Sequence, residues 1–163
     1  MKHLYGPQVQ LIDHVIMNGV LAKLCLETTV QPEINRLVSL LYTHLFSVAA
    51  QNEFRSTPAR FSTRMAAMHP EIHLEVPVID PSQKAVVVNL ARAGTWPSHV
   101  GYDFLHHVLP PSHLRQDHIM AARITDASDA VTGAQFGGLK IGGDVKRQWF
   151  FSLIPWEQPA TPL

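Results

Sequence analysis

The sequence is poor in cysteine, and this limits what sulfur can do in the protein. Its single cysteine, Cys25, cannot form a disulfide within the chain. The residue lies between Leu24 and Leu26, and this apolar setting predicts a buried, inert thiol rather than a nucleophile.

An excess of charge and a long apolar run are also missing. Thirteen Lys and Arg residues balance thirteen Asp and Glu residues, whereas proteins that bind nucleic acid usually carry a basic excess. No stretch approaches the apolar length that spans a bilayer, and residues 1–7 lack the apolar run of a signal peptide. We therefore expect a cytoplasmic protein that binds neither nucleic acid nor membranes.

What the sequence does contain is enough apolar material for one folded domain over residues 1–163. Apolar residues make up 46% of the chain and charged residues 16%, which argues against disorder. A helical part is predicted for residues 1–54, because apolar residues recur at helical spacing over 8–27 and, more clearly, over 32–54. An asparagine-glycine pair within the first of these stretches predicts two short helices or one kinked helix.

Residues 54–81 lose this pattern and predict a surface excursion with one short strand at 72–78. Three arginines lie in this excursion, Arg55, Arg60 and Arg64. Short groups of charge in polar segments are usually solvated, and a phosphate site is the alternative interpretation.

A strand, a turn and a helix are predicted in succession over residues 85–98. Three consecutive valines and a leucine predict a strand at 85–90 that is buried on both faces. The run ends at Arg92 and Gly94, where glycine would tolerate a positive φ, and Thr95 to Pro97 can begin a helix. In an open α/β sheet this turn lies at the carboxyl ends of the strands, where ligands bind, which makes Arg92 a candidate site residue.

The remainder of this core βαβ part, which we place over residues 85–155, predicts a parallel sheet. The stretch 98–109 has the apolar spacing of a helix, and a second buried strand is expected at 118–122, closed by Arg123. A strand, helix and strand in this order form a right-handed crossover. The glycine-rich stretch 125–144 predicts an extended hairpin over the sheet.

Several short motifs of this part, taken in order, resemble the uracil phosphoribosyltransferase family. They are Ala91-Arg92-Ala93-Gly94 after the valine-rich strand, Gln116-Asp117-His118 and Arg123 on the following strand, and Gly137-Gly138-Leu139-Lys140-Ile141-Gly142-Gly143 before a last apolar run. The likeness extends from about Glu33 to Pro155. Each of these motifs occurs in many proteins, so the resemblance depends on their order and spacing in this sequence.

The resemblance implies an α/β fold with a twisted parallel sheet, flanking helices and a type I phosphoribosyltransferase activity. Such an enzyme joins uracil to 5-phosphoribosyl 1-diphosphate (PRPP), with Mg²⁺, to give uridine monophosphate and pyrophosphate. In the family, residues that match Arg92, Ala93, Gly94 and Arg123 bind the pyrophosphate of PRPP. Fixed guanidinium groups suit this role because charge builds on the departing pyrophosphate. The resemblance assigns no residue here to the catalytic step itself.

The sequence departs from the family after its last apolar run, at residues 155–163. The family continues there with a glycine-containing loop and a helix that bind the 5-phosphate of PRPP, followed by a uracil-binding segment. Here the stretch has no glycine and three prolines, with Glu157 and Thr161 as possible stand-ins for a Mg²⁺-associated carboxylate and a phosphate-binding hydroxyl. We therefore expect a C-terminally incomplete phosphoribosyltransferase fold whose activity alone is doubtful.

Two alternatives to an enzyme follow from this departure and from the histidine content. The first is a non-catalytic relative that binds a phosphorylated ligand or a protein partner, whereas an enzyme would need another chain to supply the missing loop. The second is a metal-binding protein, because ten histidines are present. The histidines considered are His69, His73, His106, His107, His113 and His118. Their spacing matches no known metal motif, and we predict no metal ligands among them.

The last apolar run, residues 149–154, predicts self-association. In the family this strand lies inside the sheet, whereas here nothing after it is expected to cover its far side. Trp149, Phe150 and Phe151 would then lie beside an unpaired edge. We expect a dimer or a larger assembly of identical chains.

Overall fold

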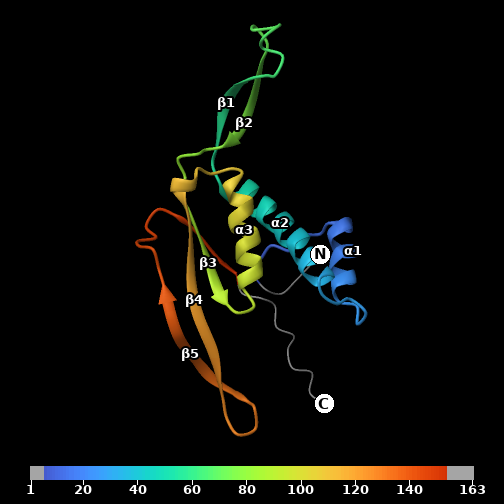
Figure 1. Cartoon of the computed structure of the whole chain (residues 1–163), viewed down its shortest axis with the longest axis vertical. Coiled ribbons are helices and arrows are strands. Elements are labelled where there is room, and N and C mark those ends of the chain that lie inside the picture. The colour runs from blue at the N-terminus through green and yellow to red at the C-terminus, as the bar shows by residue number, and fades with distance from the viewer. Residues whose placement is uncertain (1–5, 154–163) are drawn as a thin grey trace.

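The computed structural model describes residues 6–153, which form two layers and two projecting hairpins (Figure 1). The helices are α1 (Val15–Leu24), α2 (Glu33–Glu53), α3 (Thr95–His106) and a short 3₁₀ turn, η1 (Pro111–His113). Helices α2 and α3 pack on one face of a four-stranded sheet, and α1 packs against α2. The fold is therefore mixed α/β with flanking helices, as predicted. None of the helices described is both long enough and apolar enough to cross a membrane.

The sheet is mixed rather than purely parallel. Its strands are β3 (Ala85–Ala91), β4 (Leu114–Thr125), β5 (Val131–Lys140) and β6 (Trp149–Leu153), in the order β5-β4-β3-β6. The central strand β3 pairs in parallel with both β4 and β6, which confirms the predicted crossover through α3. The predicted hairpin is also present, but β5 pairs antiparallel along the edge of β4 and widens the sheet instead of lying over it.

Burial along the sheet confirms one predicted strand and corrects the other. The first five residues of β3 are buried, and two of them, Ala85 and Val87, belong to the core cluster that includes residues of α2 and α3. Strand β4 begins four residues earlier than predicted, and the stretch 118–122 is half-buried or exposed rather than buried. The reason is that β3 ends opposite Met120. Beyond that point β4 pairs only with β5, so the hairpin continues as a single layer.

The core lies between α2, α3 and the parallel strands. Its buried residues include Phe46, Phe54, Val87, Leu105 and Leu114. Aromatic rings join helix to sheet, with centroids 5.4 Å apart for Phe46 and Phe151 and 5.7 Å apart for Phe54 and Trp149. Burial of side chains of this size supplies most of the free energy that holds the two layers together.

Strand β6 is the edge of the sheet within residues 6–153, as the sequence predicts. The prediction that all three of its aromatic residues line this edge is wrong. Trp149 and Phe151 pack against the core, because alternate residues of a strand face the same side. Phe150 faces the other side and is 54% exposed.

The N-terminal part differs from the prediction in two respects. A single helix, α1, forms across the asparagine-glycine pair, and residues 8–14 are not helical. Cys25 is exposed, so the prediction of a buried thiol is wrong. Helix α1 lies on the outer side of α2 and has no buried residue, and its C-cap, Cys25, shares that exposure.

The predicted surface excursion is a two-stranded arm, made by β1 (Ser56–Ser62) and β2 (His73–Ile79). It projects from the body in the direction opposite to the β4–β5 hairpin (Figure 1). The sequence indicated only the second strand, because Pro58 in the first is atypical of a strand. In the arm Pro58 lies opposite Pro77, where neither residue needs to donate a hydrogen bond.

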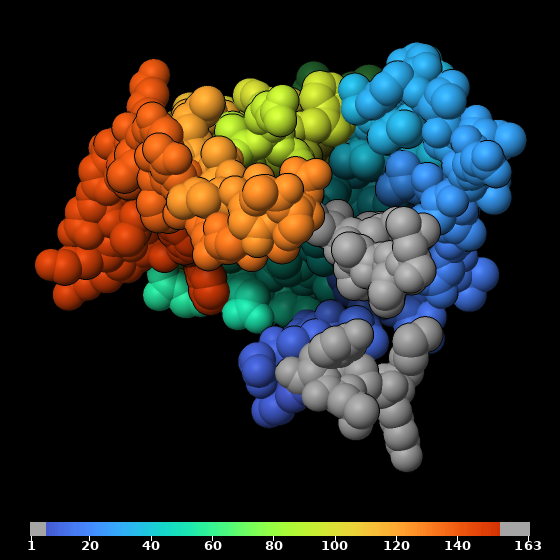
Figure 2. Space-filling model, turned by 90° about the horizontal axis from the view of Figure 1, so that it is seen from below, coloured from blue at the N-terminus to red at the C-terminus, as the bar shows by residue number. Residues whose placement is uncertain are grey.

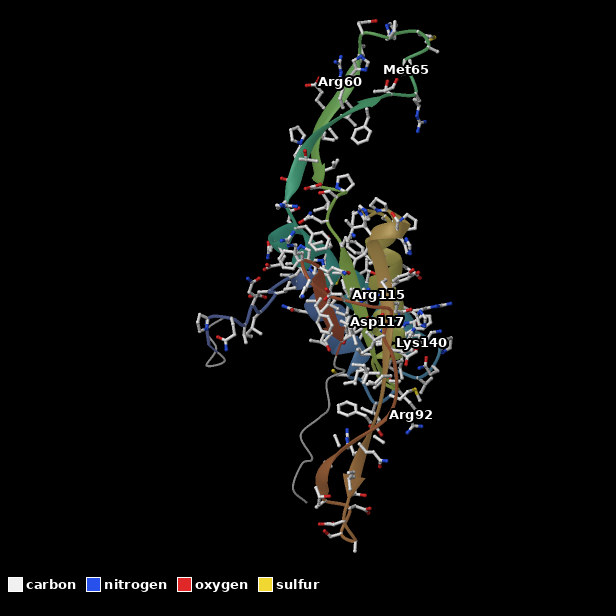
Figure 3. All side chains as sticks on the ribbon, turned by 90° about the vertical axis from the view of Figure 1, so that its left-hand side faces the viewer. Arg60, Met65, Arg92, Arg115, Asp117 and Lys140 are labelled. Carbon is white, nitrogen blue, oxygen red and sulfur yellow. The ribbon has the colours of Figure 1, made fainter. Side chains whose placement is uncertain are left out.

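A connection over residues 141–148 crosses the sheet from β5 to β6 and is held by an ion pair of β4 whose carboxylate is buried. Figure 3 labels the two residues, Arg115 and Asp117. Asp117, 3% exposed, accepts two bonds from Arg115, at 2.9 and 3.0 Å, and one from the backbone N–H of Gly142 at 3.0 Å. Arg115 also donates to the carbonyl oxygen of Gly143 at 3.2 Å. We call Arg115 and Asp117 the crossing clamp.

Candidate functional site

The loop after β3 lies directly across the ends of two strands. A Cβ atom at Gly94 would lie 2.6 Å from the carbonyl oxygen of Leu90 and 2.7 Å from that of Leu153. The φ of Gly94 is −72°, so the expectation that it serves a positive φ is wrong. Glycine is required here for space. Its absent side chain lets the loop lie against both β3 and β6 and sets Arg92 and Ala93 out in solvent.

Beneath this loop, a buried asparagine joins three elements. Asn89 on β3 is 4% exposed. Its amide nitrogen lies 3.0 Å from Nδ1 of His118 on β4, and its Oδ1 accepts from the Thr95 hydroxyl at 3.3 Å. Because an amide nitrogen only donates, Nδ1 of His118 is the acceptor of this bond. The network fixes the first turn of α3 relative to two strands.

The structure brings the two predicted arginines to the same end of the sheet. Arg92 follows the last residue of β3, which pairs with Met120, and Arg123 lies three residues further along β4. At about 3.3 Å per residue, Arg123 is about 10 Å beyond the strand ends. Figure 3 shows Arg92 where the β4–β5 hairpin begins to extend past the sheet.

Figure 2 looks onto this end of the molecule, which we call the carboxyl end of the sheet. The β4–β5 hairpin, orange to red, projects here beside the yellow-green residues near 90–100. Strands β4 and β6 flank β3 and run parallel to it, so the carboxyl ends of all three strands point to this end. In open α/β sheets, ligands bind outside the carboxyl ends of the strands.

Two predicted site residues, Glu157 and Thr161, lie outside the described residues. Ala93 and Gly94 lie in the loop with Arg92, as their adjacency requires. The four residues of the predicted pyrophosphate site are therefore at one end of the sheet, three in the loop after β3 and one on β4.

The described residues do not form a protein cage for a metal ion. Among residues 6–153 no group of three or more His, Cys, Asp or Glu side chains could hold one. At the carboxyl end the polar groups beneath the loop are Asn89, Thr95 and His118, none of them a carboxylate. Mg²⁺ prefers oxygen ligands and often binds through substrate phosphates, so this part of the chain does not fit a resident Mg²⁺ site. The same finding gives no support to the histidine-based metal hypothesis.

Sequence patterns did not reveal the roles of Asn89 and His118. The sequence does contain one signal, which is a single amide residue, Asn89, within an otherwise apolar strand. A buried polar group requires a hydrogen-bond partner, so this residue indicates that a partner lies nearby. The partner could not be identified without the parallel register, in which Asn89 lies opposite His118.

Comparison with known proteins establishes the fold alone. No family model and no curated protein matches the chain. Among solved structures, the chain is similar to the AQ2163 protein from Aquifex aeolicus, with a TM-score of 0.62 and 12% identity. The match covers 88% of this chain and 60% of the Aquifex chain. This chain therefore spans less than two thirds of that protein's length.

Proposed function

We propose that the protein binds the diphosphate of PRPP at the carboxyl end of its sheet and belongs functionally with the uracil phosphoribosyltransferases. The observation that carries the proposal is the loop over Arg92, Ala93 and Gly94. It follows a buried parallel strand, lies against the ends of β3 and β6 and presents one exposed guanidinium group. A guanidinium fork binds phosphate oxygens in pairs, which suits this ligand.

Arg123 extends the same proposal along β4. A diphosphate carries several negative oxygens, and two arginines from neighbouring strands can bind it from two sides. The hydrogen bonds of Asn89 beneath the loop support this role, because a loop backbone that is ordered before the ligand arrives loses less entropy on binding. In a transfer reaction both groups would stabilise the charge that develops on the departing pyrophosphate.

Mg²⁺ enters this proposal as an ion that accompanies the ligand. The described residues do not hold it themselves, and Mg²⁺ commonly binds through substrate phosphates and water. Affinity for PRPP should therefore be measured with and without Mg²⁺, and no step of the proposal depends on a metal site in this part of the chain.

A non-catalytic function is the alternative, in which the same loop binds a phosphorylated ligand without turnover or the chain acts through a protein partner. Calorimetry with PRPP and Mg²⁺, together with an assay for uridine monophosphate formed from uracil, separates the cases. Binding with product formation supports the enzyme, and binding without product supports the non-catalytic relative.

The site itself is tested by substitution of its arginines. Arg92→Ala and Arg123→Ala should each weaken PRPP binding by about tenfold or more, because each removes a charge-assisted contact of about 1.5 to 3 kcal/mol. Arg92→Lys should lose most of this affinity too, since Lys keeps the charge but not the fork. Arg60→Ala on the arm is the control and should bind normally. If both alanine variants bind PRPP as the unaltered protein does, the proposed site is wrong.

We also propose that identical chains associate through the β6 edge. The exposed Phe150 and the unpaired side of β6 within residues 6–153 support this. Sedimentation at micromolar concentration should show a dimer or larger species, and a stable monomer would contradict the proposal.

A further inference from the structure

A second cationic region lies at the opposite end of the sheet, where the strands begin. A groove of about 570 Å³ opens there, lined by Arg55, Ser82, Gln83, Lys84, Arg147, Gln148 and Trp149. Its three cations come from three segments: the residue after the C-cap of α2, the residue before β3 and the connection before β6. The PRPP site proposed for the carboxyl end of the sheet uses none of these residues. We call it the amino-end groove.

A buried glutamine assembles one wall of the groove. Gln83, 7% exposed, accepts from the backbone N–H of Arg55 at 3.0 Å and donates to the carbonyl oxygen of the same residue at 3.1 Å. Its Oε1 also accepts from the indole N–H of Trp149 at 3.4 Å. The side chain thereby holds the end of α2, the start of β3 and the start of β6 together.

The other wall is set by the crossing clamp. Arg115 donates to the carbonyl oxygens of Gly143 and Asp144, which fixes the connection just before it reaches the groove. Gln148 then donates to the carbonyl oxygen of Asp144 at 2.7 Å, closing a turn around Arg147. Arg147 has a φ of 58°, a conformation that non-glycine residues rarely adopt. A residue held in this way at the mouth of a groove points to a role other than folding.

The charge in the groove is only partly neutralised within the described chain. Arg55 pairs with Asp80, with 3.3 Å between Nη2 and Oδ2. Neither Lys84 nor Arg147 forms an ion pair with a carboxylate of residues 6–153. Two exposed cations therefore lie beside a cavity whose wall also carries the half-buried indole of Trp149.

We propose that the amino-end groove binds an organic phosphate the size of a mononucleotide. The phosphate lies between Lys84 and Arg147, and the ring system of the ligand lies toward Trp149. The volume is within the range of pockets for small organic ligands, about 300 to 1,000 Å³. Cations suit the phosphate, and an aromatic wall suits a planar base. The inference is independent of the function proposed for the carboxyl end.

The test uses the full chain and three probes: AMP, adenosine and inorganic phosphate. Calorimetry should show that AMP binds at least tenfold more tightly than either of the other two, because only AMP fills both parts of the groove. In ¹⁵N NMR spectra, AMP should shift the indole N–H signal of Trp149. Equal affinity for inorganic phosphate, or no binding of AMP at all, would overturn the proposal.

Variants locate the site. Lys84→Ala combined with Arg147→Gly should weaken AMP binding tenfold or more without lowering the melting temperature, because glycine adopts a positive φ freely. Arg60→Ala with Arg64→Ala removes the same charge from the arm and should leave AMP binding unchanged, as should Arg92→Ala. An equal loss of AMP affinity in the arm variant would indicate unspecific attraction between charges. A loss of AMP affinity in Arg92→Ala would indicate that AMP binds at the carboxyl end. Either result would contradict the proposal that AMP binds in the amino-end groove. Lys84→Ala alone provides the same test should the double variant fold poorly.

Discussion

The two ends of the sheet carry positive charge in different ways. At the carboxyl end one tight loop sets Arg92 across the ends of two strands, and backbone packing at Gly94 makes this possible. At the amino end the cations come from three separate segments, which side-chain hydrogen bonds of Gln83 and Asp117 hold together. The arrangement at the carboxyl end therefore depends on the lack of a side chain at Gly94. The arrangement at the amino end depends on the side chains of Gln83 and Asp117. Substitutions should separate them.

The largest effect is expected from Asp117→Ala, which breaks the crossing clamp. The change leaves Arg115 without its partner carboxylate and the N–H of Gly142 without its acceptor, so we expect a loss of about 3 kcal/mol in the free energy of unfolding. Urea denaturation measures the loss. Hydrogen exchange should accelerate over residues 142–148 and remain slow in β3.

A double substitution is the control for this prediction. Arg115→Met with Asp117→Leu removes both charges, leaves neither unpaired and should cost much less than the single change. If Asp117→Ala costs less than about 1 kcal/mol, or if exchange accelerates equally at both ends of the sheet, the clamp does not organise the amino end.

A smaller loss, about 2 kcal/mol, is expected from Gly94→Ala at the carboxyl end. The added methyl group meets two backbone carbonyl oxygens, which cannot rotate away as a side chain can, so the loop must shift. PRPP affinity should fall with stability, whereas AMP affinity should not. Urea denaturation and calorimetry on one preparation check both statements.

Gly19→Ala is the matched control for that change. Gly19 lies within α1, and apart from the backbone of its own helix no atom lies within 4 Å of the position that a Cβ would take. Alanine should therefore stabilise the helix by about 1 kcal/mol. A loss of stability at both glycines would indicate that crowding at Gly94 is not the cause.

The smallest expected effect is on stability at low pH. It concerns one carboxylate near each end of the sheet, Asp126 and Asp80. Hydrogen bonds from Ser128 hold the pKa of Asp126 below its ordinary value of 3.8, and those from Ser82, with a smaller contribution from Arg55, lower the pKa of Asp80. A lowered pKa in the folded state stabilises the protein at pH values above 3.8, and this stability is lost as the pH falls through the folded-state pKa.

Asp126→Asn and Asp80→Asn should therefore each flatten the decline of stability below about pH 4. Asp126 is exposed and Asp80 is partly exposed, so each change should be small. Urea midpoints measured across this pH range show the slope. An unchanged slope in both variants would mean that neither carboxylate contributes.

Local sequence patterns predicted the central unit of the fold well. The strand at 85–90, the turn and the helix that begins at Thr95 follow from β-branched residues, a glycine and a proline, all within a few residues of one another. Arg92 could be placed at the carboxyl end for the same reason, because the end of a strand is itself a local feature.

The crossover between β3 and β4 was predicted, but several other features that depend on pairing between distant segments were not. The first strand of the arm becomes a strand only because Ser56–Ser62 meets its partner. The exposure of β4 depends on where β3 ends, and the exposure of Cys25 depends on which side of α2 receives α1. The amino-end groove was missed for the same reason, since Arg55 is 92 residues from Arg147 and only the fold brings them together.

The base of the β1–β2 arm has a consequence for how this chain can vary. The chain leaves the body at Arg55 and returns at Asp80, and the N–H of Asp80 donates to the carbonyl oxygen of Arg55 at 2.9 Å. Gln83 secures the same point from the side of the body. The two ends of the arm are therefore joined to each other at its base, as in an inserted segment that leaves and re-enters a domain at one point. Its length and sequence are free to change, or a short turn can replace it, while the strands below keep their positions.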